Sequence, residues 1–511
     1  MTNNNCLYKI KPSTNLTKIL AEYKQKGKRI VQCHGVFDLL HLGHIRHFHQ
    51  AKKEGDVLVV TVTSDRYVRR GPGRPFFNER LRAEALASLS VVDYVAIDDA
   101  PTAVRSIKAF KPDVYAKGVD YKEKEKDITG KIYDEEEAVK SVGGRLVFTE
   151  DIIFSSTKLI NDYFDVYPPE TRRYLQTMAR KYPIESIIER LKTLTKLKVL
   201  VIGDCIIDEY HYCRPMGKSA KEQLVVNRYI SEEKFAGGSL ATANNVASVC
   251  GQVDLVTVLG RKYPHEEFIK EKLGSNVKPI FFHRSDACTI VKRRFVNEED
   301  KKKLFEICHI QDEDIPKSVE ERIFHFLKNT IRDYNLVVVS DYGHGLMTQR
   351  LIRVICSKAK YLAINVQTNS ANTGFNLVTK YPAADCVCVD ELELRFATHD
   401  KSSDLRVLAK KVYQEIGCRQ IIATRGPRGS LCYGGNGGFH EAPALSQHVI
   451  DKVGAGDAFY AFVAPCFSAG MPQDLVSFIG NAVGALAVQI ICNREPVNYV
   501  NLVKFMTRLL K

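Results

Sequence analysis

The chain has 511 residues, 45% of them hydrophobic, and this length predicts two or three domains with ordinary buried cores. No apolar run is long enough to cross a bilayer, and residues 1–5 lack the basic-then-apolar order of a secretory signal, so we expect a cytoplasmic protein without a membrane partner. The net charge of +14 favours anionic ligands such as nucleotides and sugar phosphates.

The cysteines and the basic residues narrow the class of protein further. Fourteen cysteines are scattered singly, apart from Cys386 and Cys388, and many lie in apolar runs, which indicates reduced and mostly buried thiols. No pair of spaced Cys and His clusters supports a zinc site. The basic patches at residues 66–70 and 292–294 are short and interleaved with apolar residues, which argues against a nucleic-acid-binding arm.

Residues 29–149 alternate short β-rich runs with amphipathic helices, a pattern typical of a parallel sheet covered by crossover helices. The predicted strands are residues 30–33, 57–63, 94–97, 113–116 and 145–148. The first strand runs into HGVFDLLHLGH at residues 34–44, at the edge of the sheet where ligands gather. His41 and His44 would point the same way from a helix start and could brace a triphosphate, although an ordinary helix start explains an isolated pair equally well.

The segment at residues 34–44 resembles the signature of cytidylyltransferase-like nucleotidyltransferases, and three further segments match that family in order. They are RGPGRP at residues 70–75 followed by Arg82, KGVDY at residues 117–121, and FSSTKLI at residues 154–160, where Phe154 replaces the usual Ile. The resemblance implies a Rossmann-like nucleotidyltransferase domain over residues 1–164, with His41 and His44 as catalytic residues. It implies nucleotide contacts from Gly35, Phe37, Asp38, Arg70, Arg82, Lys117, Ser155, Ser156 and Thr157, the last three as hydroxyl donors at a helix start.

Residues 165–195 lack strand patterning and are predicted to form a linker and a helix. A new strand at residues 198–203 then carries Asp208 to its carboxyl end, where this carboxylate could accept hydrogen bonds from sugar hydroxyls. The polar residues that follow, 209–235, could form a small sheet over a pocket. Next come Gly237 and Gly238, which allow either a ligand or a plain tight turn, and Asn245, which begins a helical pattern.

Three later β-rich runs also end in polar residues, which a doubly wound sheet would gather around one cleft. The run 336–340 ends at Asp341, the run 387–389 at Asp390 and Glu393, and the run 421–424 at Thr424, Gly426 and Gly429. Asp390 and Glu393 could orient magnesium-bound water, although acids of this kind are more often solvated helix starts. Thr424, Gly426 and Gly429 could hold a nucleotide.

The segment DKVGAGDAFY at residues 451–460 joins a glycine-rich turn to an apolar helix. The N–H groups of Gly454, Ala455 and Gly456 can converge with the positive end of the helix on a phosphate. Asp457, beside this anion hole, could take the proton of an acceptor hydroxyl during in-line phosphoryl transfer. Taken alone, the segment also fits an ordinary glycine-rich helix start.

Residues 198–511 resemble the ribokinase, or phosphofructokinase-B, family of carbohydrate kinases at the Gly-Gly segment, the strand ending at Thr424 and the signature at residues 454–457. The resemblance implies a doubly wound domain with a small β lid over residues 196–511, Asp457 as the base and Asn481 beside the adenine. The predicted substrate contacts are Asp208, Gly237, Gly238, Asn245 and Asp341. Three departures alter sugar-facing positions: Ala241 replaces Asn, Lys452 replaces Thr, and Asn365-Val-Gln367 with the polar run 368–376 replaces an Asp-Pro-Lys-like segment.

Together the halves resemble bifunctional heptose kinase/nucleotidyltransferases with the domain order reversed. We therefore expect an α/β enzyme that phosphorylates a sugar or sugar phosphate with ATP and transfers a nucleotidyl group from CTP or ATP, with Mg²⁺ at both sites. The expected partners are small molecules and, by resemblance only, a second copy of the chain. Two alternatives stay open: a kinase-like domain that only senses a ligand, and a basic nucleic-acid-binding protein whose affinity falls steeply with salt.

Overall fold

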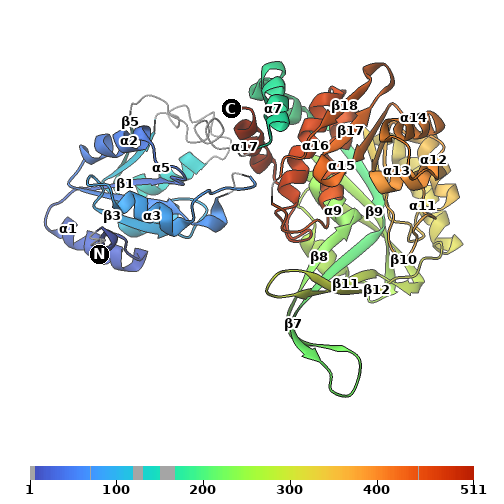
Figure 1. Cartoon of the computed structure of the whole chain (residues 1–511), viewed down its shortest axis with the longest axis horizontal. Coiled ribbons are helices and arrows are strands. Elements are labelled where there is room, and N and C mark those ends of the chain that lie inside the picture. Colours follow the sequence, from blue (N-terminus) through green and yellow to red (C-terminus); the bar gives the residue numbers. More distant parts are fainter. Residues whose placement is uncertain (1–5, 69–70, 119–130, 150–166, 447) are drawn as a thin grey trace. The chain divides into compact units, whose positions relative to one another are not determined.

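The computed structural model describes residues 6–68, 71–118, 131–149, 167–446 and 448–511. The chain forms two compact units, Met1–Pro168 with Thr507–Leu509 and Lys511, and Pro169–Met506 with Leu510. Each unit contains its own main sheet, which is parallel or mostly parallel and has helices on both faces (Figure 1). No helix within the described ranges is long and apolar enough to span a bilayer.

Among the described residues of the first unit, five strands form one sheet in the order β3-β2-β1-β4-β5, and every neighbouring pair is parallel. They are β1 (Ile30–Gly35), β2 (Val57–Thr63), β3 (Tyr94–Asp98), β4 (Val114–Gly118) and β5 (Arg145–Thr149). The strands predicted from the sequence are thereby confirmed. The direction of the strand order changes between β1 and β4, which places a ligand crevice at the carboxyl ends of these two strands.

The helices of the first unit bury apolar side chains on both faces of this sheet. They are α1 (Ser13–Gln25), α2 (Leu42–Lys52), α3 (Glu79–Ala87), α4 (Val104–Phe110) and α5 (Lys131–Ser141). Along β2, Val57 and Val59 pack with Leu16 of α1, whereas Leu58 and Val60 pack with Phe48 of α2. Alternate residues of a strand point to opposite faces, so the apolar run of β2 suits a sheet that is covered on both sides.

Among the described residues of the second unit, nine strands form the sheet β10-β9-β6-β13-β14-β15-β16-β17-β18. They are β6 (Lys198–Gly203), β9 (Gln252–Lys262), β10 (Val277–Cys288), β13 (Leu336–Asp341), β14 (Leu362–Val366), β15 (Cys386–Asp390), β16 (Gln420–Thr424), β17 (Ser430–Tyr433) and β18 (Phe439–Ala442). The pairs from β10 to β16 are parallel, and β17 and β18 extend the sheet in antiparallel fashion. The carboxyl ends of the parallel strands therefore meet at one edge.

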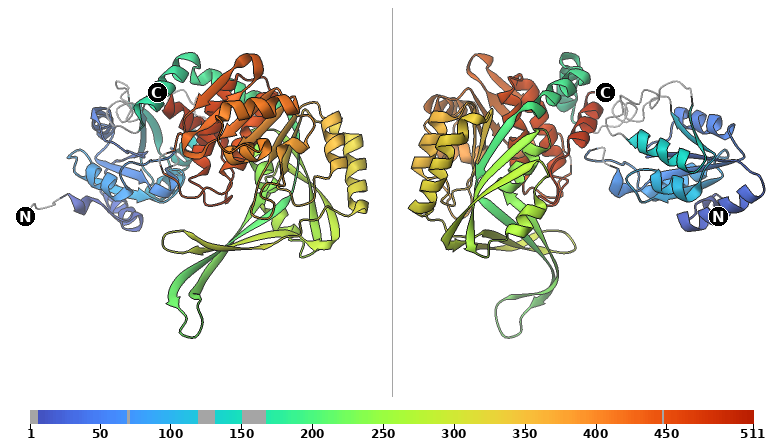
Figure 2. Two further views of the ribbon diagram at one scale, coloured as in Figure 1. Left: turned by 45° about the vertical axis from the view of Figure 1, so that its right-hand side comes forward. Right: turned by 180° about the vertical axis from the view of Figure 1, so that it is seen from behind.

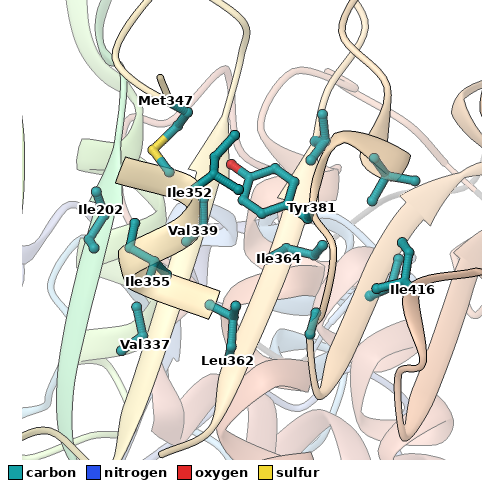
Figure 3. Close-up of a cluster of buried hydrophobic side chains, with 14 of the residues drawn as sticks. Ile202, Val337, Val339, Met347, Ile352, Ile355, Leu362, Ile364, Tyr381 and Ile416 are labelled. Atoms are coloured by element: carbon teal, nitrogen blue, oxygen red, sulfur yellow. The ribbon is translucent and has the colours of Figure 1, made fainter. Parts of the chain in front are cut away.

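The face of this sheet covered by α11 to α14 holds a large apolar core. The helices are α11 (Lys317–Thr330), α12 (Gln349–Lys358), α13 (Glu391–Thr398) and α14 (Leu405–Ile416). Figure 3 shows Ile352 and Ile355 of α12 lying against Val337, Val339 and Ile364 of the strands. Each such fully buried aliphatic side chain stabilises the fold by about 1.5–3 kcal/mol.

Three helices cover the opposite face: α9 (Ser239–Ala247), α15 (Ala455–Ser468) and α16 (Gln473–Ala487). Helix α15 is almost entirely apolar, and Tyr460 on it donates a hydrogen bond to the carbonyl of Val339 in β13, at 3.0 Å. This bond ties α15 to the central strand. The remaining helices of this unit are α7 (Pro169–Lys181), α8 (Ile184–Thr193), α10 (Glu266–Lys272) and α17 (Tyr499–Leu509).

A separate sheet in the order β12-β11-β7-β8 forms the predicted lid. Its strands are β7 (Cys205–Lys218), β8 (Val225–Gly238), β11 (Ile290–Asn297) and β12 (Lys303–His309). The hairpin of β7 and β8 projects away from the body of its unit, as the views of Figures 1 and 2 agree. The inner end of the hairpin is buried, and its tip is exposed.

Candidate active sites

Asp457 is the third residue of α15 and lies at the carboxyl ends of β13 and β14. The helix begins after Gly454, whose φ of +82° favours glycine. A Cβ at this position would also lie 1.9 Å from Oδ1 of Asn493, so any other residue would displace the Asn493 side chain. Gly456 faces open space, which leaves room for an anion in front of the first N–H groups of the helix.

The Asp457 carboxylate is buried, and its Oδ1 accepts two hydrogen bonds, from Tyr342 Oη at 2.6 Å and from Gln367 Nε2 at 2.5 Å. Burial raises the pKa of Asp457 to about 6, and nearby Asp208 adds to this rise, while the two hydrogen bonds and Lys292 oppose it. A carboxyl that titrates just below neutrality is a suitable general base at physiological pH.

Asp208 and Gly237 meet where β7 pairs with β8. A Cβ on Gly237 would lie 2.1 Å from Asp208 Oδ2, so the carboxylate packs against the glycine backbone. Oδ1 of Asp208 accepts a hydrogen bond from the buried guanidinium of Arg294 in β11. Gly238 follows with φ +56°, close to the carbonyl of Asp204. The structure thus brings three of the predicted substrate residues together at the inner end of the lid hairpin.

Asp341 and Asn245 have hydrogen-bond partners within the protein, and their substrate contacts stay predictions. Asp341 is 1% exposed, and its oxygens accept from Gly343 N at 2.9 Å, Tyr381 Oη at 2.7 Å and Lys380 Nζ at 2.6 Å. Asn245 donates to the carbonyl of Ala241 and accepts from Val497 N, both at 2.9 Å. Because their polar atoms are already used inside the protein, these side chains stabilise the chain around the site.

Asp390 and Glu393 form the N-terminal cap of α13, and their role in orienting magnesium-bound water stays a prediction. Each side chain accepts the backbone N–H of the other at 2.7 Å, a capping box. The second oxygen of Glu393 accepts Thr368 N at 3.0 Å. Burial, followed by the charge of Asp390, raises the pKa of Glu393 to about 8. The pair therefore fits a helix cap better than a set of metal ligands.

The predicted nucleotide residues of the second unit gather around the turn between β16 and β17. Thr424 ends β16 and pairs with Ser430 of β17, and Gly426 and Gly429 have φ of +56° and +79° in the turn between them. Asn481 of α16 donates to Ser430 Oγ at 2.6 Å. The structure brings these four residues together, and Asn481 anchors α16 to the turn.

In the first unit, the imidazoles of His41 and His44 stack at the start of α2, with ring centroids 3.9 Å apart and an interplanar angle of 21°. Phe37 packs against Gly35 at the end of β1 and contacts the edge of the His44 ring. Burial lowers the pKa of His41. The predicted pair of imidazoles therefore exists, next to the crevice between β1 and β4.

The charged residues predicted to grip phosphate in the first unit are paired within the protein. Arg82 has a fully buried side chain that donates to the carbonyls of Val36, Thr63 and Phe77 and to Asp65 Oδ1. These donors hold loops of the crevice together, and the phosphate contact of Arg82 stays a prediction.

Lys117 and Asp38 also have partners within the protein. Lys117 Nζ lies 2.9 Å from Glu135 Oε2 in a buried ion pair. Asp38 accepts from Arg74 Nη1 at 2.7 Å and from Phe76 N at 2.6 Å, and so fastens the loop before α3. Both residues thus have partners in the protein, and their nucleotide contacts stay predictions. Arg70, Ser155, Ser156 and Thr157 lie outside the described residues.

Sequence reasoning did not assign a role to several polar residues beside the two sites. His34 hydrogen-bonds Thr61 Oγ1 at 2.9 Å and Thr63 Oγ1 at 3.2 Å, and burial lowers its pKa to about 3. Tyr342 and Gln367 directly follow the residues that end β13 and β14, and this position after a strand was the available signal.

Comparisons with known proteins agree with these folds. The family model described as pfkB family carbohydrate kinase matches residues 196–491, more than half of the chain, and the cytidylyltransferase-like model matches residues 33–163. The bifunctional protein HldE of Trichlorobacter lovleyi is 36% identical over 310 residues, which cover 60% of this chain and 61% of that protein. HldE of Campylobacter jejuni is 43% identical over 298 residues, which cover 57% and 61%.

These matches span less than two thirds of the length of the curated relatives. Among solved structures, phosphofructokinase-2 from Escherichia coli in complex with substrates and products aligns with a TM-score of 0.51 and 12% identity. That alignment covers 62% of this chain and 100% of the other, and it shows the shared fold.

Proposed function

Since this chain belongs to the pfkB family of carbohydrate kinases, we propose that its second unit transfers the γ-phosphoryl group of ATP to a hydroxyl of a sugar or sugar phosphate of heptose-like type. We propose further that the first unit transfers a nucleotidyl group from ATP or CTP to a sugar phosphate and releases pyrophosphate. The match of residues 33–163 to the cytidylyltransferase-like model supports this second activity.

The position of Asp457 carries the kinase proposal. In the proposed reaction its carboxylate takes the proton of the acceptor hydroxyl, the acceptor oxygen bonds to the γ-phosphorus, and the bond to the β-phosphate oxygen breaks, so ADP leaves. The N–H groups at the start of α15, from Ala455 and Gly456, stabilise the charge on the moving phosphoryl group. Asp208, beside Gly237, accepts hydrogen bonds from the acceptor.

The stacked imidazoles of His41 and His44 carry the nucleotidyltransferase proposal. An oxygen of the sugar phosphate attacks the α-phosphorus, the bond to the β-phosphate breaks, and pyrophosphate leaves. The imidazoles donate hydrogen bonds to phosphate oxygens, where charge builds up in the transition state. The hydroxyls of Ser155, Ser156 and Thr157 and the guanidinium of Arg70 remain proposed contacts.

The proposal includes magnesium bound to the phosphates of the nucleotides. In the described parts of the chain, no group of three or more His, Cys, Asp or Glu side chains could hold a metal ion. The capped pair Asp390 and Glu393 does not fit as direct ligands. Magnesium bound to the triphosphate would neutralise phosphate charge.

We also propose the division of the chain into a nucleotidyltransferase domain, 1–164, a linker and helix, 165–195, and a kinase domain, 196–511, which the two matched ranges support.

We propose a homodimer that forms through the lid. The lid strands and the turn between β7 and β8 expose Met216, Leu224, Val225, Tyr229, Leu304, Phe305 and Ile307. Changing both Val225 and Phe305 to Lys should yield a monomer by light scattering, and a wild-type monomer would contradict the dimer.

One incubation tests the proposed function. The full chain is mixed with ATP, CTP and a panel of heptoses, pentoses, polyols and their phosphates, and the products are identified by mass. We expect ADP and a phosphorylated sugar from one member of the panel, and pyrophosphate with a nucleotide-sugar from a sugar phosphate. Release of ADP that no panel member increases would contradict the kinase proposal.

A further inference from the structure

We propose that Tyr342 and Gln367 are positioning residues that clamp Oδ1 of Asp457, leave Oδ2 to take the proton, and set the proton affinity of the carboxylate. The catalytic meaning of this inference rests on the proposed kinase function. The clamp itself is a property of the folded chain and can be measured without turnover.

The geometry of the carboxylate supports the clamp. Both hydrogen bonds, at 2.5 and 2.6 Å, end on the same oxygen, Oδ1, and come from the residues that directly follow two neighbouring strands, β13 and β14. An oxygen that already accepts two short hydrogen bonds is a poor site for a further proton. The proton of an acceptor hydroxyl therefore goes to Oδ2, and the two donors fix the orientation of that oxygen.

The polar run that departs from the kinase family pattern holds both donors in place. Asn369 and Asn372 each donate to the carbonyl of Tyr342 at 2.7 Å. Asn376 donates to the carbonyl of Gln367 at 3.0 Å, and the Gln367 amide also donates to Asn365 Oδ1 at 2.9 Å. The asparagines of residues 365–376 thus build the support of the clamp, which accounts for this otherwise unexplained segment.

The charge of the clamp matters as much as its geometry. Gln367 is a neutral donor where the resemblance to carbohydrate kinases leads one to expect a lysine, so Oδ1 receives a hydrogen bond without a positive charge. The other titratable groups that influence the Asp457 carboxylate, or are influenced by it, are Tyr342, Asp208, Lys292, Glu393 and Cys388. A cation at position 367 would add directly to the effect of Lys292.

The test is a titration of Asp457 by carbon-detected NMR in the full chain, with ¹³C in the aspartate carboxyl groups. The Asp457 signal is the one that disappears in Asp457→Asn. For the wild type we expect a midpoint near pH 6. Gln367→Lys should lower this midpoint by at least about one pH unit, whereas Gln367→Leu and Tyr342→Phe should raise it, because each removes a hydrogen bond to the charged form.

Tyr334→Phe is the matched control, because Tyr334 also donates from a buried phenol to a carboxylate, Asp254 Oδ2, at 2.6 Å. It should leave the Asp457 midpoint unchanged. Equal midpoints in the wild type, Gln367→Lys and Tyr342→Phe would overturn the clamp, whether or not the chain phosphorylates a sugar. Shifted midpoints in a chain that yields no phosphorylated product would uphold the clamp and reject the kinase function instead.

Discussion

The buried environment of Asp457 predicts how the rate of phosphoryl transfer depends on pH. Its pKa of about 6 lies above the ordinary value near 3.9, so the base is protonated, and cannot accept a proton, below about pH 6. We predict that kcat/KM for phosphoryl transfer falls about tenfold per pH unit below pH 6 and is level between pH 7 and 8. A profile that stays level down to pH 4.5 would show an unperturbed carboxyl.

His34 gives a second prediction, on the stability of the first unit. Its folded-state pKa of about 3 lies below the ordinary value of 6.5, so between these values the unfolded chain binds a proton that the folded chain does not. Stability is then complete above about pH 6.5 and is lost as pH falls toward 3, by up to about 1.4 kcal/mol per pH unit.

Urea midpoints followed by far-UV circular dichroism at pH 7 and 5 measure this loss, since the chain has no tryptophan. His34→Gln keeps a neutral polar side chain and should reduce the difference between the two midpoints. An unchanged difference in His34→Gln would assign the acid sensitivity to other groups, such as His47, whose pKa burial lowers to about 4.

Among the structural elements, variants at the start of α13 can distinguish a helix cap from a metal site. Asp390→Ala removes the capping acceptor and should lower the stability of the second unit by about 1 kcal/mol, whereas Asp390→Asn, which still caps, should cost only a few tenths. Urea midpoints of the two variants test this. A raised magnesium requirement of kinase activity in Asp390→Asn would instead show that the carboxylate acts on the metal.

The elements themselves were largely predictable, and the side-chain partners were not. Residues 57–63 could be identified as a strand because seven consecutive apolar or β-branched residues suit a strand buried on both faces. The Arg82 guanidinium donates to the carbonyls of Val36 and Thr63, which are distant in the sequence. The periodicity of the sequence carries no information on such contacts. The sequence placed Asp341 at a strand end, as observed, but it did not predict that the Asp341 carboxylate accepts hydrogen bonds from Tyr381 and Lys380.

The turn at the glycine-rich segment before α15 could be predicted from the sequence for a physical reason. The turn before α15 has a positive φ at Gly454, which favours glycine, so the residue type in the sequence indicates the backbone geometry directly. The partners of Asp457 directly follow β13 and β14, more than 85 residues away in the sequence, and only the fold shows that they meet it. Position after a strand therefore predicts where a site lies, and the fold decides which side chains face it.

At the scale of the whole molecule, two units with separate sheets each hold one candidate site, so each activity should be removable alone. Asp457→Asn keeps the size of the side chain but removes the base, and His44→Ala removes one of the stacked imidazoles. Loss of a general base lowers a rate by about 10²–10⁴. Asp404→Asn, at the exposed cap of α14, controls for the change of charge.

The most direct measurement follows ADP and pyrophosphate separately in the wild-type chain and both variants, with ATP, CTP and the acceptors found in the panel. We predict that Asp457→Asn loses acceptor-dependent ADP release and keeps pyrophosphate release, and that His44→Ala does the reverse. Loss of both activities in either variant, with its circular dichroism spectrum unchanged, would contradict two separate sites.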